Sequence, residues 1–108
     1  MSTKIICEGN EVLAELSGEL DHHNAPAIRE LIDDYLEKNH PQSLILDFDK
    51  VSFMDSSGIG LVMGRYKLIS SFNGSVECRN LSSHAYKVMR LSGIEKIAKI
   101  RKKREEKQ

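Results

Sequence analysis

The sequence predicts a small α/β domain: a mixed sheet of four to five strands with helices packed against it. Two strand-like segments come first, and helix and strand patterns then alternate along the chain. Helices that cross over between successive strands imply parallel pairing. The hairpin-like pair at the start implies antiparallel pairing, so the strand directions are mixed. At 108 residues the chain is long enough for one such domain.

The N-terminal third contains two strand patterns and the clearest helix. Residues 4–7 are short and apolar, and residues 11–17 alternate between apolar and polar. The apolar face of the second segment consists of Val12, Ala14 and Leu16. After a turn at 18–24, Asn24 is a good helix N-cap, and Pro26 falls in the first turn, where a missing N–H is harmless. Apolar residues then recur at helical spacing, at Ile28, Leu31, Ile32, Tyr35 and Leu36.

The remaining two thirds alternate between strand and helix patterns. The compact apolar run at 43–49 is typical of a central strand that protein covers over much of its length. A helix is expected at 57–72, a strand at 75–79, a shorter helix at 82–93 and a last short strand at 97–100.

Composition and charge exclude several classes of protein. We expect residues 1–100 to form the domain and residues 101–108 to be a charged, solvated tail, because the tail has no apolar residue. Sixteen basic and sixteen acidic residues leave no net charge, which does not favour a nucleic-acid-binding protein. No long apolar run or secretory signal is present, so we expect a cytoplasmic protein without a membrane span. Cys7 and Cys78 form no Cys-x-x-Cys pair, and we expect two reduced thiols packed as small hydrophobes.

The stretch FMDSSGIGLVMGRYK, residues 53–67, places three glycines near the start of a predicted helix, although each glycine costs a helix about 1 kcal/mol relative to alanine. On a helical wheel one apolar arc consists of Ile59, Val62, Met63, Tyr66 and Ile69. The opposite arc consists of Gly60, Leu61, Gly64, Leu68 and Ser71. We expect this second arc to face solvent as a flat patch on which another protein docks. The alternative is that the glycines ease packing within the domain.

Asp55, Ser56 and Ser57 lie where this helix begins, and any of the three can cap it by accepting a hydrogen bond from its free N–H groups. A hydroxyl there can also be phosphorylated, which adds about −1.5 to −2 charges. The helix N-terminus tolerates such an anion, whereas a protein docked on the glycine patch would have to bury it. The pattern predicts a site that changes binding without changing the fold. It does not choose between Ser56 and Ser57.

Two stretches, GELDHHNA at 18–25 and DFDKVSFMDSSGIGLVMGRYK at 47–67, resemble the anti-sigma factor antagonists of the STAS domain family. The resemblance is greatest to the sporulation anti-anti-sigma factors and covers roughly residues 5–100. It implies a STAS-type mixed sheet with helices mainly on one face. Family members commonly end in a further amphipathic helix, and residues 101–108 depart from that pattern.

The resemblance also implies a regulator rather than an enzyme. Unphosphorylated members bind an anti-sigma factor that is also a serine kinase, and this binding releases the sigma factor. The kinase uses ATP to phosphorylate the serine after the aspartate, which is Ser56 here, and a PP2C-type phosphatase reverses the step. The chain itself is expected to need no cofactor or metal and to be monomeric alone. The expected partner-binding residues are Asp21, His22, His23, Asp55, Ser57, Gly58, Gly60, Leu61 and Gly64.

Other functions have less support in the residues. A hydrolase is disfavoured because there is no G-x-S-x-G elbow and no histidine that can be assigned as a base for Ser56. A small nucleotide-binding protein remains an alternative, although SSGIG resembles a phosphate loop only loosely. A metal site at His22 and His23 is disfavoured, because two histidines next to each other in the sequence rarely point at one metal. A STAS regulator of a stress-signalling pathway stays open, because the sequence does not name its kinase.

Overall fold

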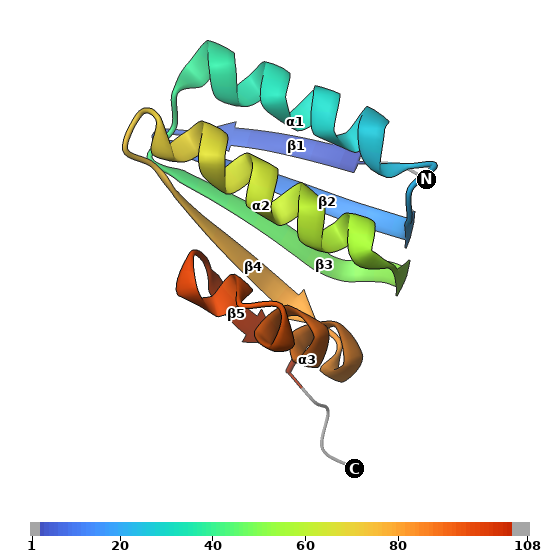
Figure 1. Cartoon of the computed structure of the whole chain (residues 1–108). Helices are drawn as coiled ribbons and strands as arrows, with labels where there is room; N and C mark the ends of the chain where they lie inside the picture. The colour runs from blue at the N-terminus through green and yellow to red at the C-terminus, as the bar shows by residue number, and fades with distance from the viewer. Residues whose placement is uncertain (1–2, 105–108) are drawn as a thin grey trace.

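The structure, a computed structural model, describes residues 3–104 and contains a five-stranded mixed sheet with its strands in chain order (Figure 1). β1 (Thr3–Glu8) runs antiparallel to β2 (Glu11–Leu20). β3 (Ser43–Met54), β4 (Ser75–Leu81) and β5 (Lys99–Lys102) follow in parallel. The predicted hairpin and the parallel crossovers are therefore both confirmed.

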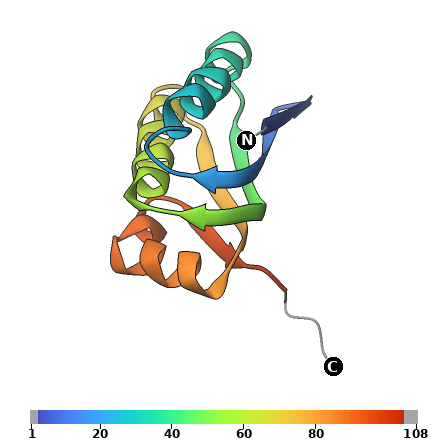
Figure 2. The same cartoon turned by 90° about the vertical axis from the view of Figure 1, so that its right-hand side faces the viewer.

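Three helices cover one face of this sheet: α1 (Ala25–Asn39), α2 (Ser56–Ser70) and α3 (Ser83–Leu91). A short 3₁₀ helix, η1 (Ile94–Lys96), precedes the last strand. Figure 2 shows the helices on one side and the other face of the sheet uncovered. Crossovers of one hand that step along the sheet in one direction place their helices on the same face. The strand order β2-β3-β4-β5 meets that condition.

The core lies between the sheet and the helices. The predicted apolar face of β2 is buried, with Val12, Ala14 and Leu16 at most 1% exposed. From α1 the buried side chains are Ile28, Ile32 and Leu36. Successive residues of β3, Leu44, Ile45 and Leu46, are all at most 4% exposed. Because neighbours on a strand point to opposite faces, Leu44 and Leu46 face the helices, whereas Ile45 is buried on the face without helices, beside Leu13 and Glu77 of the adjoining strands.

The chain differs from the sequence-based expectation at its end. The last strand begins at Lys99 rather than 97 and runs to Lys102, so Arg101 and Lys102 belong to the sheet and not to a tail that starts at 101. Lys103 continues the ordered part, with its Nζ 2.9 Å from Oδ1 of Asp49. Backbone pairing with β4 and the ion pairs of Arg101 and Lys103, rather than apolar burial, hold these residues, so their composition gave no signal. Residues 105–108 lie outside the described chain.

The two cysteines also differ from each other. Cys78 is fully buried in the core, as expected for a thiol packed as a small hydrophobe. Cys7 is exposed on β1, so the expectation that both thiols are packed is wrong for this one. Cys7 lies on β1, and among residues 3–104 no further strand pairs with the outer edge of β1.

Candidate functional site

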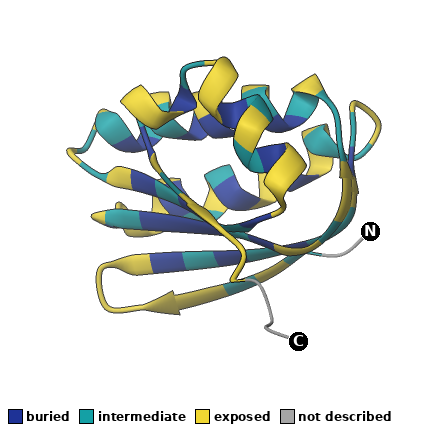
Figure 3. Ribbon diagram, turned by 90° about the horizontal axis from the view of Figure 1, so that it is seen from below, coloured by how far each residue is buried: buried dark blue, intermediate teal, exposed yellow. Residues whose placement is uncertain are grey.

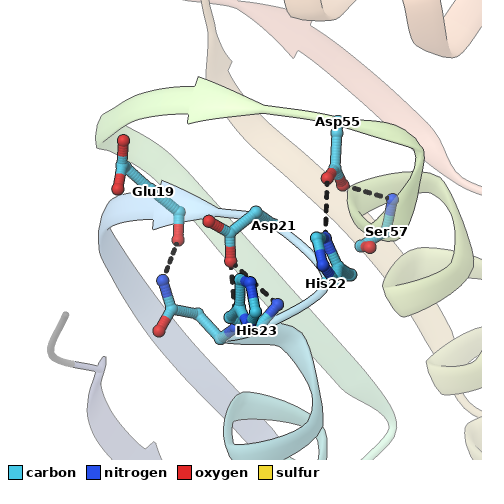
Figure 4. A network of polar contacts seen from close by, with 7 residues as sticks. Glu19, Asp21, His22, His23, Asp55 and Ser57 are labelled. Atoms are coloured by element: carbon cyan, nitrogen blue, oxygen red, sulfur yellow. Dashed lines mark hydrogen bonds and ion pairs between the residues drawn. The ribbon is translucent and has the colours of Figure 1, made fainter.

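The two sequence stretches that stand out, LDHHN and MDSSG, meet at the carboxyl ends of two neighbouring strands. The parallel strands β2 and β3 end side by side, with Leu20 paired to Met54. The backbone N–H of Asp55 donates to the carbonyl of Leu20 at 3.2 Å. The loops that follow these strands, which lead into α1 and α2, are therefore neighbours (Figure 4). Ligand and partner sites of parallel sheets commonly lie at these carboxyl ends.

Asp21 orders the loop before α1. Its Oδ1 accepts hydrogen bonds from the backbone N–H groups of His23 and Asn24, both at 3.0 Å. Asn24 is at the N-cap position, as predicted, but its side chain makes no cap bond and donates instead to the carbonyl of Glu19 at 2.9 Å. His22 and His23 are left exposed on this ordered loop, with ring centroids 4.2 Å apart.

Asp55 is the residue that caps α2. Its Oδ1 accepts the backbone N–H of Ser57 at 2.7 Å, and its Oδ2 lies 3.8 Å from Nδ1 of His22. The hydrogen bond from Ser57 is the main cause that lowers the pKa of this carboxyl, and the nearby His22 acts in the same direction. With Asp55 as the cap, the fold requires neither serine hydroxyl for that purpose. Ser56 is the first residue of α2 and is exposed, whereas Ser57 is half-buried.

The glycines of α2 fall into two groups. At Gly60 and Gly64 a Cβ atom would meet nothing within 4 Å, so both face open space, as the wheel predicts. Gly58 is buried, and a Cβ there would lie 2.5 Å from Cγ and Sδ of Met54. The prediction that Gly58 lies on the partner-binding surface is therefore wrong, because this glycine is buried. Its lack of a side chain lets α2 begin close against the end of β3.

The predicted buried arc of α2 is also wrong in part. Leu61, expected on the exposed arc and among the partner-binding residues, is 3% exposed, whereas Met63, expected in the core, is 43% exposed. The reason is that α2 packs against α1 as well as against the sheet. The buried arc is therefore turned toward α1. The outward stripe at the start of the helix consists of Ser56, Gly60 and Met63.

Arg65 is a buried charged residue that the sequence reasoning missed. It is 5% exposed, and its Nε lies 2.7 Å from Oδ1 of Asp33 on α1. Its position three or four residues from Leu61, Val62 and Ile69 is the signal that places it on the buried arc. An acidic partner on α1 is what makes this burial acceptable.

A groove of about 290 Å³ runs between the N-terminal halves of α1 and α2. Its lining residues are His22, Ala25, Pro26, Arg29, Ser57, Gly60, Leu61 and Arg65. The groove opens beside the outward stripe of α2, and the side chain of Ser57 belongs to it rather than to the open surface. Besides Met63, Phe53 is an exposed apolar residue near the start of α2. It lies three residues before Ser56, and 53% of it is exposed.

The comparison with protein families decides where the chain belongs. A model of the STAS domain matches residues 4–107. The chain belongs to the STAS domain family. The anti-sigma F factor antagonist of Paenibacillus polymyxa is 34% identical over 89 residues, which are 82% of this chain and 76% of that relative. The anti-sigma-B factor antagonist of Bacillus subtilis is 30% identical over 96 residues, 89% of this chain and 86% of the relative.

Solved structures of STAS relatives share the fold. The anti-sigma factor antagonist SpoIIAA in its unphosphorylated form matches with a TM-score of 0.75 and 30% identity, over 93% of this chain and 87% of that one. The Bacillus cell fate determinant SpoIIAA in the phosphorylated form matches with a TM-score of 0.74 and 32% identity, over 93% and 91%. The unphosphorylated and the phosphorylated relative match this STAS domain with nearly the same TM-score.

Within residues 3–104, no three His, Cys, Asp or Glu side chains are arranged to hold a metal ion. In the same part of the chain, every helix is too short or too polar to span a bilayer.

Proposed function

We propose that this STAS domain is an anti-sigma factor antagonist whose Ser56 is phosphorylated by its anti-sigma partner. The observation that supports the proposal best is the exposed Ser56 at the start of α2, next to the open backbone of Gly60. The relatives named as antagonists of anti-sigma F and anti-sigma-B factors support the class of partner.

Ser56 is favoured over Ser57 by burial and by contacts. The Ser57 N–H is held by Asp55 at 2.7 Å, and its half-buried side chain lines the groove between the helices. A kinase must bring the hydroxyl in line with the γ-phosphorus of ATP, which requires free approach to the oxygen. Ser56 offers that approach without local unfolding. In the transfer, Ser56 Oγ loses its proton, bonds to the γ-phosphorus and releases ADP.

The phosphate acts on binding rather than on the fold. At the first residue of α2 it lies within reach of the positive end of the helix, so the domain tolerates it. A partner that contacts Gly60 and Met63 would have to bury two negative charges and a bulky group beside Asp55. A phosphatase of the PP2C type then restores the hydroxyl by hydrolysis. In this proposal the ATP is bound by the kinase, the protein itself needs no cofactor, and the switch operates in the cytoplasm.

The proposal is tested by mixing the protein with the anti-sigma factor kinase of its own organism and ATP. Mass spectrometry then locates the phosphate in wild type, Ser56→Ala and Ser57→Ala. We expect wild type and Ser57→Ala to be phosphorylated at residue 56, and Ser56→Ala to stay unmodified. Phosphate on Ser57, or labelled Ser56→Ala protein, would show that the assigned serine is wrong.

Binding is measured separately with the same three proteins before and after the kinase reaction. Ser56→Ala should keep its affinity for the anti-sigma factor in the presence of ATP, whereas wild type should lose at least about tenfold, the effect of 1.4 kcal/mol. The similarity to an anti-sigma-B factor antagonist favours a stress-pathway kinase as a second candidate partner. Presenting the protein to both types of kinase, where the organism has both, separates the two candidates. Binding to neither would contradict the proposed class of function.

A further inference from the structure

The edge of the sheet formed by β1 has no partner within the described chain. β1 pairs with β2 on one side only and is the outermost strand. Figure 3 shows this strand largely exposed along one margin of the sheet. An exposed edge presents free N–H and C=O groups, and proteins usually protect it with charges, prolines or short length. β1 has six residues and no proline.

The charges along β1 are complementary to themselves. Lys4 and Glu8 lie two residues before and two residues after Ile6. Because the side-chain period of a strand is two, all three point to the same face of the sheet. If a second β1 runs antiparallel to the first with Ile6 opposite Ile6, each lysine lies opposite a glutamate of the other copy. Directly opposed charges of opposite sign stabilise antiparallel pairs.

This pairing also relieves an unfavourable contact inside the domain. Glu8 lies directly opposite Glu11 on β2, and like charges in that arrangement are destabilising. Lys4, by contrast, lies opposite Glu15 and has a favourable neighbour. A second copy would provide the missing positive charge beside Glu8.

Exposed apolar side chains lie on both sides of the same edge. Ile6 is 37% exposed and continues a row across the open face of the sheet through Leu13 to Ile45. On the helix side, Leu31 of α1 is 38% exposed. It borders a shallow cavity of about 180 Å³ that also includes Thr3 of β1. Exposed apolar residues gathered at one place mark an interaction surface more often than scattered ones do.

We propose that β1 is the interface of a homodimer, in which two copies of β1 pair antiparallel about Ile6 and join two sheets into one. The pairing is two-fold symmetric, so it occupies the β1 edge of both copies and does not extend into a fibre. β2 lies between β1 and β3, the strand that leads into α2, so the dimer does not use the stripe that carries Ser56. The inference is therefore independent of the proposed function.

The dimer is expected to be weak. Residues 1–55, which include β1 and α1, contain twelve acidic and only four basic residues, so two copies joined here repel each other at long range. A monomer at low concentration is then compatible with a dimer at high concentration. The protein is therefore expected to be a monomer at low concentration, as the sequence predicts, and a dimer only at high concentration.

A charge exchange tests the interface. Lys4→Glu alone and Glu8→Lys alone each place like charges opposite each other in a self-pair, so each variant should be monomeric by analytical ultracentrifugation where wild type dimerises. Mixed one to one, the glutamates of the first variant meet the lysines of the second, and a heterodimer should form. Recovery on mixing also shows that both variants are folded. Wild type that stays monomeric up to about 1 mM, or variants that dimerise as well as wild type, would overturn the proposal.

A cross-link tests the register. In the variant Ile6→Cys with Cys7→Ser, the two introduced thiols face each other across the interface, at a separation that a disulfide spans. Mild oxidation should convert it to a covalent dimer at least tenfold faster than wild type, whose Cys7 lies opposite Ile5 of the other copy. Faster cross-linking of wild type would mean that the pairing is not centred on Ile6.

Discussion

Arg65 on α2 and Asp33 on α1 form an ion pair that crosses between the two helices, with Nε 2.7 Å from Oδ1. Its Nη2 donates to Oδ2 of Asp33 at 3.2 Å, and its Nη1 donates to the carbonyl of Leu61 at 3.4 Å. Burial raises the pKa of Asp33 and lowers that of Arg65, and the attraction between the two groups opposes both shifts. The pair joins the two helices, and Arg65 also lines the groove to which Ser57 belongs.

Replacing one member of this pair should lower the free energy of unfolding more than replacing both members does. Arg65→Met leaves Asp33 with only a quarter of its side chain exposed and without its cation, so we expect a loss of roughly 2 to 4 kcal/mol in the free energy of unfolding. Arg65→Met combined with Asp33→Leu should recover most of that loss. Urea unfolding of the wild type, both single variants and the double variant measures the coupling. A single variant as stable as wild type would mean that the pair does not stabilise the domain.

The cap at Asp55 should make the stability of the domain depend on pH. Its pKa in the folded state is lower than in the unfolded chain, so the carboxylate stabilises the fold above the unfolded pKa. That contribution is lost as the pH falls through the folded pKa. The difference in thermal midpoint between wild type and Asp55→Ala should therefore be largest at neutral pH and vanish in acid. Asp34→Ala on the exposed side of α1 is a control that removes a carboxylate but no cap. A pH-independent difference would contradict the role of the charge.

The two kinds of glycine in α2 should respond oppositely to substitution. Gly60→Leu adds a side chain in open space and replaces a poor helix former, so stability should rise by about 0.5 kcal/mol. Binding to the anti-sigma factor should fall, because the added side chain separates the surfaces. Gly58→Ala meets the side chain of Met54 and should destabilise by about 1 to 3 kcal/mol. Thermal unfolding and a binding assay on both variants check this. Unchanged binding of Gly60→Leu would remove α2 from the interface.

The two thiols should differ in reactivity by several orders of magnitude. Burial raises the pKa of Cys78 to about 12, so at pH 8 only about one molecule in ten thousand carries the thiolate. Cys7 is exposed. A colorimetric thiol reagent should therefore label one cysteine in the native protein and a second only after denaturation. The Cys7→Ser variant should show no rapid labelling, and two fast thiols in the wild type would contradict the burial of Cys78.

Much of the fold follows from local pattern. The alternation at 11–17 identifies the buried face of β2, and the spacing in α1 identifies Ile28, Ile32 and Leu36 as core residues. In both elements the buried residues keep a plain spacing, every second residue in β2 and every fourth in α1, so periodicity alone is sufficient. α2 is different, because it contacts α1, η1 and two strands of the sheet, β3 and β4. Its buried arc is rotated toward α1 relative to the predicted arc, which exchanges Leu61 and Met63 and includes Arg65.

The sequence by itself determined the order of strands and helices, the start of α2 near Asp55 and the outward position of Gly60. These features depend on residues close together in the chain, such as caps, turns and repeating apolar positions. Only the tertiary structure decided that Ser56 is exposed while Ser57 faces a groove, and that β1, with Lys4 and Glu8 on either side of Ile6, is the outermost of the described strands. The physical reason is that exposure is set by whichever segments fold over a residue, and here those segments are distant in the chain.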